Sequence, residues 1–279
     1  MQLYIPFGNL GTYIVELLNM TEEDYAAIEE YFTPMINSAS VKSRDAIAKA
    51  FQFAVSRCPH ENQSDIWHHV LYRIYLRNKI GTNPEQSWVR TSGEAFELIL
   101  AQTYNPFLAR EGIRLTPLTS KEQRKDALLR MGLTNLIGSS KIDLTIEKRG
   151  KGKGILLDGY GIVGGVHAKV SLAERVSDDI PASRIMMANN FLSILTTLDV
   201  KSFPPPRGDL VNRGELGSPN NPSDKRRYIE EHGDFSACFS YNHRTLPSLQ
   251  ETRSGRRIYL AEFKNNLDSF VQFLVATIA

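Results

Sequence analysis

The sequence has few cysteines and no long apolar segment, and both shortages exclude classes of protein. Two cysteines in 279 residues, Cys58 and Cys238, are too few for a disulfide scaffold or a zinc site. No run of 18 apolar residues occurs, and the acidic, charge-interrupted N-terminal region is unlike a signal peptide. The six histidines are scattered and form no H-E-x-x-H motif. We therefore expect a soluble, cytoplasmic protein that does not act at a membrane.

The composition is that of an ordinary globular protein. Apolar residues make up 42% of the chain and charged residues 23%, so a sizeable core is available. No Pro/Gly/Ser-rich linker divides the sequence, and we predict a single domain over residues 1–279. The net charge of +2 neither favours nor excludes a nucleic-acid partner, because a basic cleft can be offset by acids elsewhere.

Residues 1–80 are predicted to be mainly helical. Thr21 precedes a cluster of acids and is expected to cap the first helix, and a second helix follows Ser43. The adjacent His68 and His69 fall on different faces of a third helix, so we interpret them as ordinary helix residues rather than as a ligand pair. The same helix carries an apolar stripe that predicts a buried face, formed by Trp67, Val70, Leu71, Ile74 and Tyr75.

In the second half of the chain, a helix is predicted to begin near Pro181 and to continue through an apolar run to Leu198. The stretch 201–228 is rich in turn-forming and basic residues, and we predict a flexible loop there. Two strands and a closing helix are expected after it, at 235–241, 256–263 and 267–278.

Two short segments, 141–147 and 166–172, alternate apolar and polar residues with a strict period of two. This pattern is typical of half-buried strands that carry one polar face. The R-G-K-G-K-G sequence between them supplies glycines where a turn needs a positive φ. We therefore predict an antiparallel hairpin in which Asp143 and Lys169 lie on neighbouring strands.

An acid beside a lysine on adjacent strands is the smallest set of catalytic side chains expected of a metal-dependent nuclease. The carboxylate can hold a hard cation, and the ammonium group can steady the attacking water or the phosphate. On spacing alone, however, an ordinary cross-strand ion pair between Asp143 and Lys169 is the favoured interpretation.

Glu97 is a candidate third member of this group. Thr91 and Glu94 have the spacing of a capping box, which gives Glu94 a structural role at a helix start. Glu97 instead shares an apolar helix face with residues such as Leu100 and Tyr104, where a lone carboxylate must be desolvated unless a cation or donors meet it. The alternative is a carboxylate bonded to an arginine in the core.

Glu174 and Arg175 follow Lys169 at the point where its strand should end. Side chains at that edge can project toward the bases of a bound duplex. Arginine is the natural bidentate partner of guanine, and an acid accepts from the cytosine amino group, so this pair suits a G·C-rich site. A solvated surface ion pair is the default interpretation of the same two residues.

Together these segments resemble the CCGG-recognising type II restriction endonucleases of the PD-(D/E)XK superfamily. The resemblance extends over nearly the whole chain and is carried by long runs, among them W-H-H-V-L-Y-R-I-Y, S-W-V-R-T-S-G-E-A-F-E, G-G-V-H-A-K-V-S-L-A-E-R-V-S-D-D-I-P-A-S-R-I-M-M and K-S-F-P-P-P. It implies an α/β fold with a mixed central sheet flanked by helices, a helical N-terminal part, and a catalytic and recognition core over residues 88–200.

The resemblance also implies an activity and its residues. The expected reaction is Mg²⁺-dependent hydrolysis of double-stranded DNA at a palindrome containing CCGG, with A/CCGGT as the expected site and 5′ overhangs. Asp143 matches the metal-binding aspartate, Lys169 the catalytic lysine and Glu97 the helix glutamate near the site. Glu174 and Arg175 match the end of the recognition element of the family.

Two departures from the family pattern concern the acids and the arginines. The superfamily places an acid two residues before the lysine, where this chain has His167. Glu97 is our choice for the missing carboxylate and metal ligand, with Asp178 or Asp179 as substitutes. Ala173 stands where the first arginine of the recognition element is expected. Arg90 is therefore the candidate for the missing guanine contact, and Ser171 and Asp178 are further expected DNA contacts.

The expected mechanism is in-line attack of water on a phosphodiester, with Asp143 and Glu97 holding Mg²⁺ and Lys169 acting on the water and phosphate. A palindromic site predicts a homodimer on DNA, and a cognate DNA methyltransferase is the expected functional partner. Two other hypotheses remain, a non-cleaving DNA-binding protein and a structure-selective nuclease on the same fold.

Overall fold

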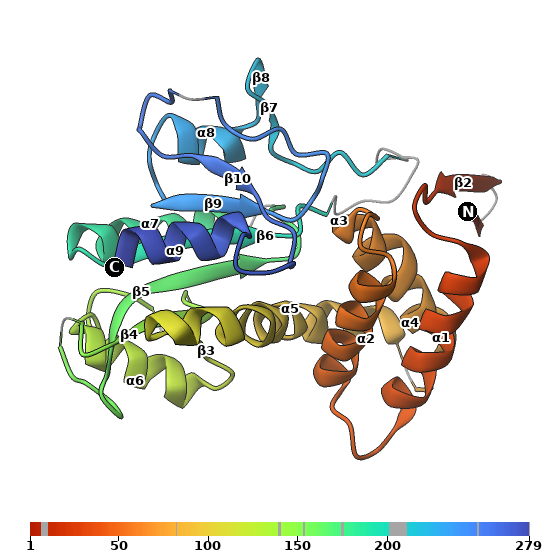
Figure 1. Ribbon diagram of the computed structural model, residues 1–279, viewed down its shortest axis with the longest axis horizontal. Coiled ribbons are helices and arrows are strands. Elements are labelled where there is room, and N and C mark those ends of the chain that lie inside the picture. Colours follow the sequence, from red (N-terminus) through yellow and green to blue (C-terminus); the bar gives the residue numbers. More distant parts are fainter. Residues whose placement is uncertain are drawn as a thin grey trace.

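The structure is a computed structural model that describes residues 1–6, 11–81, 83–138, 141–152, 154–173, 176–200, 211–249 and 251–278. Its centre is a six-stranded sheet with the strand order β10-β9-β6-β5-β4-β3 (Figure 1). The strands are β3 (Ile113–Pro117), β4 (Leu144–Arg149), β5 (Tyr160–Lys169), β6 (Leu192–Thr197), β9 (Ala237–Ser240) and β10 (Ile258–Leu260). The first three pair antiparallel and β5, β6, β9 and β10 pair parallel, so the predicted mixed sheet is confirmed.

Helices cover both faces of this sheet. The long helix α5 (Pro84–Leu108) and the closing helix α9 (Ser269–Ile278) pack on one face, in a core shared with β4, β5, β6 and β9. The other face is covered by α6 (Lys121–Met131), α7 (Val176–Ala188) and α8 (Asp224–Glu230). Each face therefore has its own apolar layer, as an α/β fold requires.

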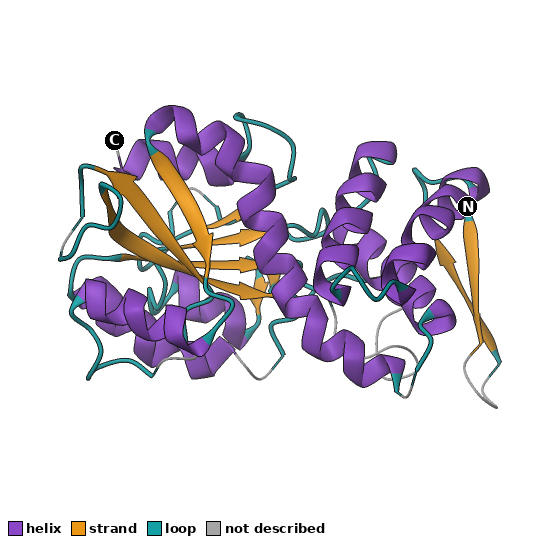
Figure 2. Ribbon diagram, turned by 90° about the horizontal axis from the view of Figure 1, so that it is seen from below, coloured by secondary structure: helices purple, strands orange, loops and turns teal. Residues whose placement is uncertain are grey.

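The N-terminal part is helical, as predicted, and α5 links it to the sheet. Figure 2 shows α5 running across the sheet and on to the N-terminal helices. These are α1 (Glu22–Asn37), α2 (Ser43–Arg57), α3 (Gln63–Asp65), the π-helix η2 (Ile66–Leu71) and α4 (Tyr72–Asn78), beside a hairpin of β1 (Gln2–Pro6) and β2 (Thr12–Glu16). A 3₁₀ turn, η3 (Ala109–Glu111), follows α5. Among the helices described, none combines the length and the apolar character needed to cross a membrane.

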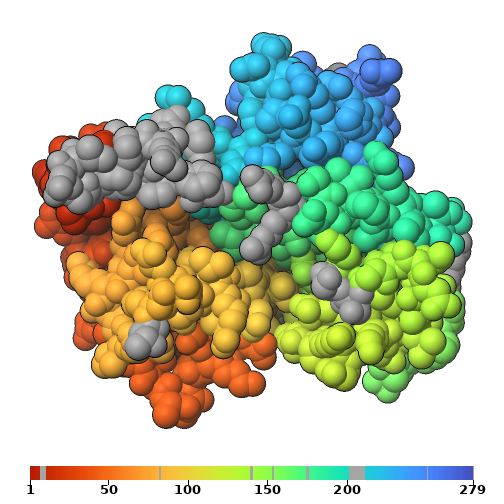
Figure 3. All heavy atoms as spheres, turned by 180° about the vertical axis from the view of Figure 1, so that it is seen from behind, coloured from red at the N-terminus to blue at the C-terminus, as the bar shows by residue number. Residues whose placement is uncertain are grey.

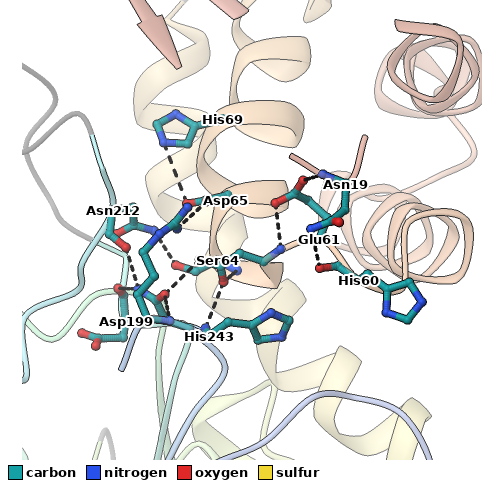
Figure 4. A network of polar contacts seen from close by, with 12 residues as sticks. Asn19, His60, Glu61, Ser64, Asp65, His69, Asp199, Asn212 and His243 are labelled. Carbon is teal, nitrogen blue, oxygen red and sulfur yellow. Dashed lines mark hydrogen bonds and ion pairs between the residues drawn. The ribbon is translucent and has the colours of Figure 1, made fainter. Parts of the chain in front are cut away.

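Buried polar contacts join the N-terminal helices to the ends of two parallel strands (Figure 4). The Asn62 side-chain amide donates to Asn242 Oδ1 at 2.9 Å, just beyond β9. The Asn242 amide in turn donates to the backbone carbonyl of Asp199 at 3.1 Å, just beyond β6. Arg244 Nη1 lies 2.5 Å from Asp65 Oδ2. Since unmade bonds of buried groups cost free energy, these contacts fix the helical part against the sheet.

The chain from Pro181 to Leu198 does not form the single helix predicted for it. Helix α7 begins five residues earlier, at Val176, and ends at Ala188, and the apolar residues that follow form β6. Asn190 adopts the left-handed conformation with φ of 60°, which ends the helical path. A short apolar run is compatible with a buried helix or a buried strand, and here pairing with β5 and β9 decides for the strand.

The hairpin of β4 and β5 is confirmed, but its strands are buried on both faces rather than half-buried. Thr145, Glu147 and His167, expected on a polar surface, are at most 1% exposed. The Glu147 carboxylate is met by Arg114 Nε at 2.6 Å and by Arg130 Nη1 at 3.1 Å, so its charge is paired inside the protein. The turn glycines Gly150 and Gly152 have positive φ, as the sequence predicted.

Two further local predictions have different outcomes. Thr21 caps α1 with a complete capping box formed with Asp24. The capping box of Thr91 and Glu94 is wrong, because α5 begins at Pro84 after the cap residue Asn83. Thr91 bonds to the carbonyl of Ser87 within the helix, and Glu94 pairs with Arg44 at 3.0 Å.

The loop predicted over 201–228 is only partly within the described residues. Residues 201–210 lie outside them. The remainder is not a continuous loop, since it contains the short hairpin of β7 (Gly217–Ser218) and β8 (Asn221–Pro222) and the first residues of α8. Ser223 caps α8 by accepting a bond from the Arg226 backbone amide, which explains why this polar stretch is ordered.

Replacing Glu147 with alanine should destabilise the fold strongly, because it leaves the buried guanidinium of Arg130 without its partner. We expect the free energy of unfolding in urea to fall by about 3 to 5 kcal/mol. Asp224→Ala breaks an exposed ion pair with Arg227 and serves as the control, with an expected loss below about 1 kcal/mol. Equal losses for the two variants would contradict the role given to Glu147.

Candidate active site

Asp143 is attached to strand β5 by both its backbone and its side chain. Its backbone N–H donates to the carbonyl of Val166 at 3.0 Å, and its Oδ2 accepts from the backbone N–H of Ala168 at 2.8 Å. The same oxygen lies 3.1 Å from Lys169 Nζ. The hairpin thus brings together the acid and the lysine that the sequence placed on neighbouring strands.

Asp179 is the second acid at this lysine. It lies on α7 and is 3% exposed, and its Oδ2 is 2.9 Å from Lys169 Nζ. Burial acts to lower the pKa of Lys169, but the carboxylates of Asp143 and Asp179 outweigh it and hold that pKa above its usual value. The lysine is therefore a cation at neutral pH, placed between two carboxylates.

The Glu97 side chain lies beside Asp143 and Lys169 and belongs to α5, which packs on the face of the sheet opposite α7. It is 6% exposed, and its Oε2 has no hydrogen-bond partner. Burial raises the pKa of Glu97 to about 8, and the charge of Asp143 adds to this effect. Within the described residues no arginine lies within ion-pair distance of Glu97, so a core salt bridge does not account for it.

His167, which occupies the position of the acid in the superfamily pattern, is fully buried. Its Nε2 lies 3.0 Å from Ser193 Oγ, and its Nδ1 lies 3.7 Å from Asp179 Oδ2. Burial lowers the pKa of His167 in spite of the neighbouring carboxylate. The histidine is thus a neutral, hydrogen-bonded part of the interior behind Asp179.

A cleft of about 550 Å³ lies between the N-terminal helices and the end of β5, and Asp179 and His167 lie outside its lining. In the space-filling view the N-terminal helices, in orange, lie beside the green segment that contains β5 and α7 (Figure 3). Glu97, Asp143 and Lys169 line the cleft together with Arg90 and Ser171. Other lining residues are His68, Tyr72, Trp88, Val89, Ser92, Gly93, Glu94, Ala168, Val170, Ala173 and Val200.

The remaining residues predicted for DNA binding are placed differently. Asp178 is exposed on α7, whereas its neighbour Asp179 is buried, and neither residue is part of the cleft lining. Glu174 and Arg175 lie outside the described residues. Ala173, the last described residue before them, lines the cleft.

Comparison with known proteins identifies the class. Residues 120–266 match the family described as BsaWI restriction endonuclease type 2, which covers more than half of the chain. The chain belongs to this family of type II restriction endonucleases, and the predicted family and fold are confirmed. At the level of single proteins, it is 61% identical over 279 residues to the type II restriction enzyme AgeI from Thalassovita gelatinovora, with 100% of both chains covered. The crystal structure of a specific AgeI–DNA complex matches with a TM-score of 0.95 over 99% of each chain, at 61% identity.

The structure brings together three of the residues singled out from the sequence and places a fourth acid beside them. Asp143, Lys169 and Glu97 share the cleft, and Asp179, a less favoured substitute for the missing carboxylate, contacts Lys169. Asp179 lies within α7 because this helix begins at Val176 rather than at Pro181. Two consecutive acids are typical of a first helical turn, and this signal would have moved the helix start toward Val176.

Glu97 should make the stability of the metal-free protein depend on pH. The pKa of Glu97 is raised from 4.5 in the unfolded chain to about 8 in the folded protein, so the folded state binds more protons between these values. The contribution of Glu97 to the free energy of unfolding is fully present below pH 4.5 and is lost as the pH rises toward 8. In EDTA, urea unfolding from pH 5 to 8 should therefore show a steeper fall for the wild type than for Glu97→Gln. Identical slopes would show that Glu97 ionises normally.

Proposed function

We propose that this chain cleaves double-stranded DNA at a palindrome containing CCGG, with A/CCGGT as the target and 5′ overhangs as the product. The observation that carries the proposal is the full-length likeness to AgeI, a type II restriction enzyme whose matching crystal structure is a DNA complex. The cluster of Asp143, Lys169 and Glu97 in one cleft supports a cleaving rather than a merely binding protein.

We further propose that Asp143 and Glu97 hold Mg²⁺. Within the described residues, no group of three or more Asp, Glu, His or Cys side chains is arranged as a metal-binding site. Two carboxylates nevertheless suit Mg²⁺, which keeps several waters, and the partnerless Oε2 of Glu97 is an oxygen donor that a cation would satisfy. When bound, Mg²⁺ supplies Lewis-acid stabilisation of the charge that develops on the scissile phosphate.

The protein groups have separate tasks in this proposal. Lys169 carries the positive charge that orients the attacking water and offsets negative charge on the phosphate in the transition state. Asp179 holds the lysine from the α7 side at 2.9 Å, so that its ammonium group stays directed at the cleft. Glu97 must lose its proton before it can bind a cation, because a carboxylic acid is a poor ligand.

A palindromic target is matched by a two-fold protein, so we expect a homodimer on DNA that cuts both strands. The whole chain, 1–279, acts as one nuclease unit in this proposal, supported by a core that extends from Phe51 and Trp67 in the N-terminal helices to Phe239 in the sheet. A cognate DNA methyltransferase and a cytoplasmic location are expected of a restriction enzyme.

Digestion of a plasmid with and without EDTA, followed by sequencing of the fragment ends, tests the proposed function directly. Ends that all read 5′-CCGGT in Mg²⁺ and no cutting in EDTA are expected. Binding without cutting would instead identify a non-cleaving DNA-binding protein. Cutting at junctions or flaps without a sequence preference would identify a structure-selective nuclease.

Substitutions at the cluster should separate catalysis from binding. Asp143→Ala, Lys169→Ala and Glu97→Ala should each reduce cleavage below detection while specific binding in Ca²⁺ persists, because these groups act on the metal and the transition state. Asp179→Asn should slow cleavage roughly ten- to a hundredfold, as expected for a residue that orients a catalytic group. Asp126→Asn provides the control, since Asp126 is exposed on α6 outside the cleft lining and its substitution should leave the cleavage rate unchanged. A normal rate for Glu97→Ala at saturating Mg²⁺ would remove Glu97 from the site.

We also propose that Arg175 and Arg90 contact guanines, with Glu174, Ser171 and Asp178 as further DNA contacts. Arg90 is exposed on the cleft wall, and in the described part of the chain no acid pairs with it. Losing a bidentate guanine contact costs roughly 1 to 3 kcal/mol for each half-site. Competition binding in Ca²⁺ should therefore show that Arg175→Ala and Arg90→Ala lose most of their preference for CCGG over a duplex with one substituted G·C pair. An unchanged specificity ratio for either variant would show that its arginine does not contact a guanine.

A further inference from the structure

The wall of the cleft opposite Asp143 and Lys169 is built by the N-terminal helices, and the proposed chemistry makes no use of it. His68 and Tyr72 line it from a π-helical segment, η2, and from the residue that follows. The Tyr72 backbone N–H donates to the carbonyl of Trp67, five residues earlier, which widens the turn. Single π-helical turns are costly and occur frequently at functional sites.

The two side chains form a rigid aromatic surface. Their rings are stacked with centroids 5.9 Å apart and an angle of 9° between the planes. Tyr72 packs against Trp88 of α5 at 5.5 Å, and Trp88 packs against the buried Trp67 at the same distance. The surface is therefore anchored in the core on one side and faces the cleft on the other.

The two side chains of this surface are polar but uncharged, and the charge nearest to them in sequence is that of Arg73, whose guanidinium carbon lies 5.6 Å from the centroid of the Tyr72 ring. Burial lowers the pKa of His68 to about 4, and the charge of Arg73 adds to this effect, so its imidazole is neutral at pH 7. A neutral imidazole offers one donor and one acceptor. Within the described residues, no side-chain hydrogen bond is found for His68 or Tyr72, so their polar atoms are available to a ligand.

Helix α5 relates this surface to the candidate active site. Arg90 and Glu97 are seven residues apart and lie on the same helix face, about 10 Å apart along the axis. Tyr72 contacts Trp88, so the aromatic surface is at the Arg90 end of the cleft. For a duplex whose axis runs along α5, an offset of about 10 Å corresponds to about three base-pair steps.

We propose that His68 and Tyr72 form a DNA contact of their own, an uncharged aromatic surface that packs on the sugars or base edges of nucleotides a few base pairs from the scissile phosphate. This inference rests on the proposed function, since it takes the cleft as the site of duplex DNA. It replaces the interpretation of His68 as an ordinary helix residue and leaves that interpretation in place for His69, which is buried.

The test is binding of a duplex containing ACCGGT in Ca²⁺, measured over a range of salt concentrations. His68→Ala and Tyr72→Leu should each weaken binding about tenfold, the size of an aromatic contact with a nucleotide. Because the rings are uncharged, the slope of log affinity against log salt should stay at its wild-type value. His60→Ala is the matched control, since His60 is an exposed histidine outside the cleft lining, and it should bind like the wild type.

Thermal unfolding establishes that each variant is folded. Tyr72 packs against Trp88, and its substitution removes that contact from the core. If Tyr72→Leu fails to fold, the duplex affinity of His68→Ala alone tests the inference. Folded His68→Ala that binds within twofold of the wild type overturns the inference. A loss of affinity accompanied by a flatter salt slope also overturns it, because it would indicate a charged contact with phosphate. If the wild-type protein itself does not prefer the ACCGGT duplex, the proposed function fails instead.

Discussion

The attachment of Asp143 to strand β5 is the contact on which the site depends. Its N–H is bonded to Val166, and its carboxylate is bonded to the backbone of Ala168, so neither the acid nor the end of β5 can shift alone. Lys169 is the next residue along β5, and its ammonium group meets the same oxygen. The register of one hairpin therefore sets the geometry of the acid and the lysine together, and a slip by one residue would turn them to opposite faces.

Burial is the main reason why the pKa of Glu97 is raised and Glu97 keeps its proton, and the charge of Asp143 adds to this effect. Asp143 and Asp179 both contact the lysine, and a third carboxylate nearby would add an unpaired negative charge in a buried place. Protonation of Glu97 avoids that cost, which is why its pKa is raised. A divalent cation would reverse this balance, because it supplies the positive charge that lets all three acids ionise. Proton release and cation binding are coupled in such a site.

The sequence predicts those parts of the site that depend on local pattern. Strict alternation gives the hairpin and thus Asp143 beside Lys169, and a carboxylate on an apolar helix face identifies Glu97. The contact of Asp179 with Lys169 is not predicted by local pattern, because the position of Asp179 depends on where α7 begins, and that start is set by packing. For the same reason the apolar run after α7 was assigned to a helix, although pairing on both sides makes it the strand β6.

Tertiary packing also decides which polar residues become functional. Glu147 and Asp143 have the same place in the alternating pattern, yet Glu147 is neutralised by two arginines while Asp143 opens into the cleft. His68 and His69 are neighbours, and the π-helical turn places one at the cleft and the other in the interior. Periodicity separates the faces of His68 and His69 but does not predict which face lines the cleft, nor that Arg114 of β3 and Arg130 of α6 pair with Glu147.

The buried contacts at that junction give the two walls of the cleft a common support. Asp199 follows β6 and directly precedes Val200 in the cleft lining, and it is bonded to Asn242, which also bonds to Asn62 ahead of α3. The wall that carries His68 and the strand end that carries Lys169 are therefore held at a fixed spacing by buried hydrogen bonds as well as by α5. Buried networks of this kind are costly when broken, so the spacing of the two walls is a property of the folded chain itself. In the proposed function, the groups proposed to contact nucleotides and those proposed to act on phosphate therefore lie at a preset distance from one another.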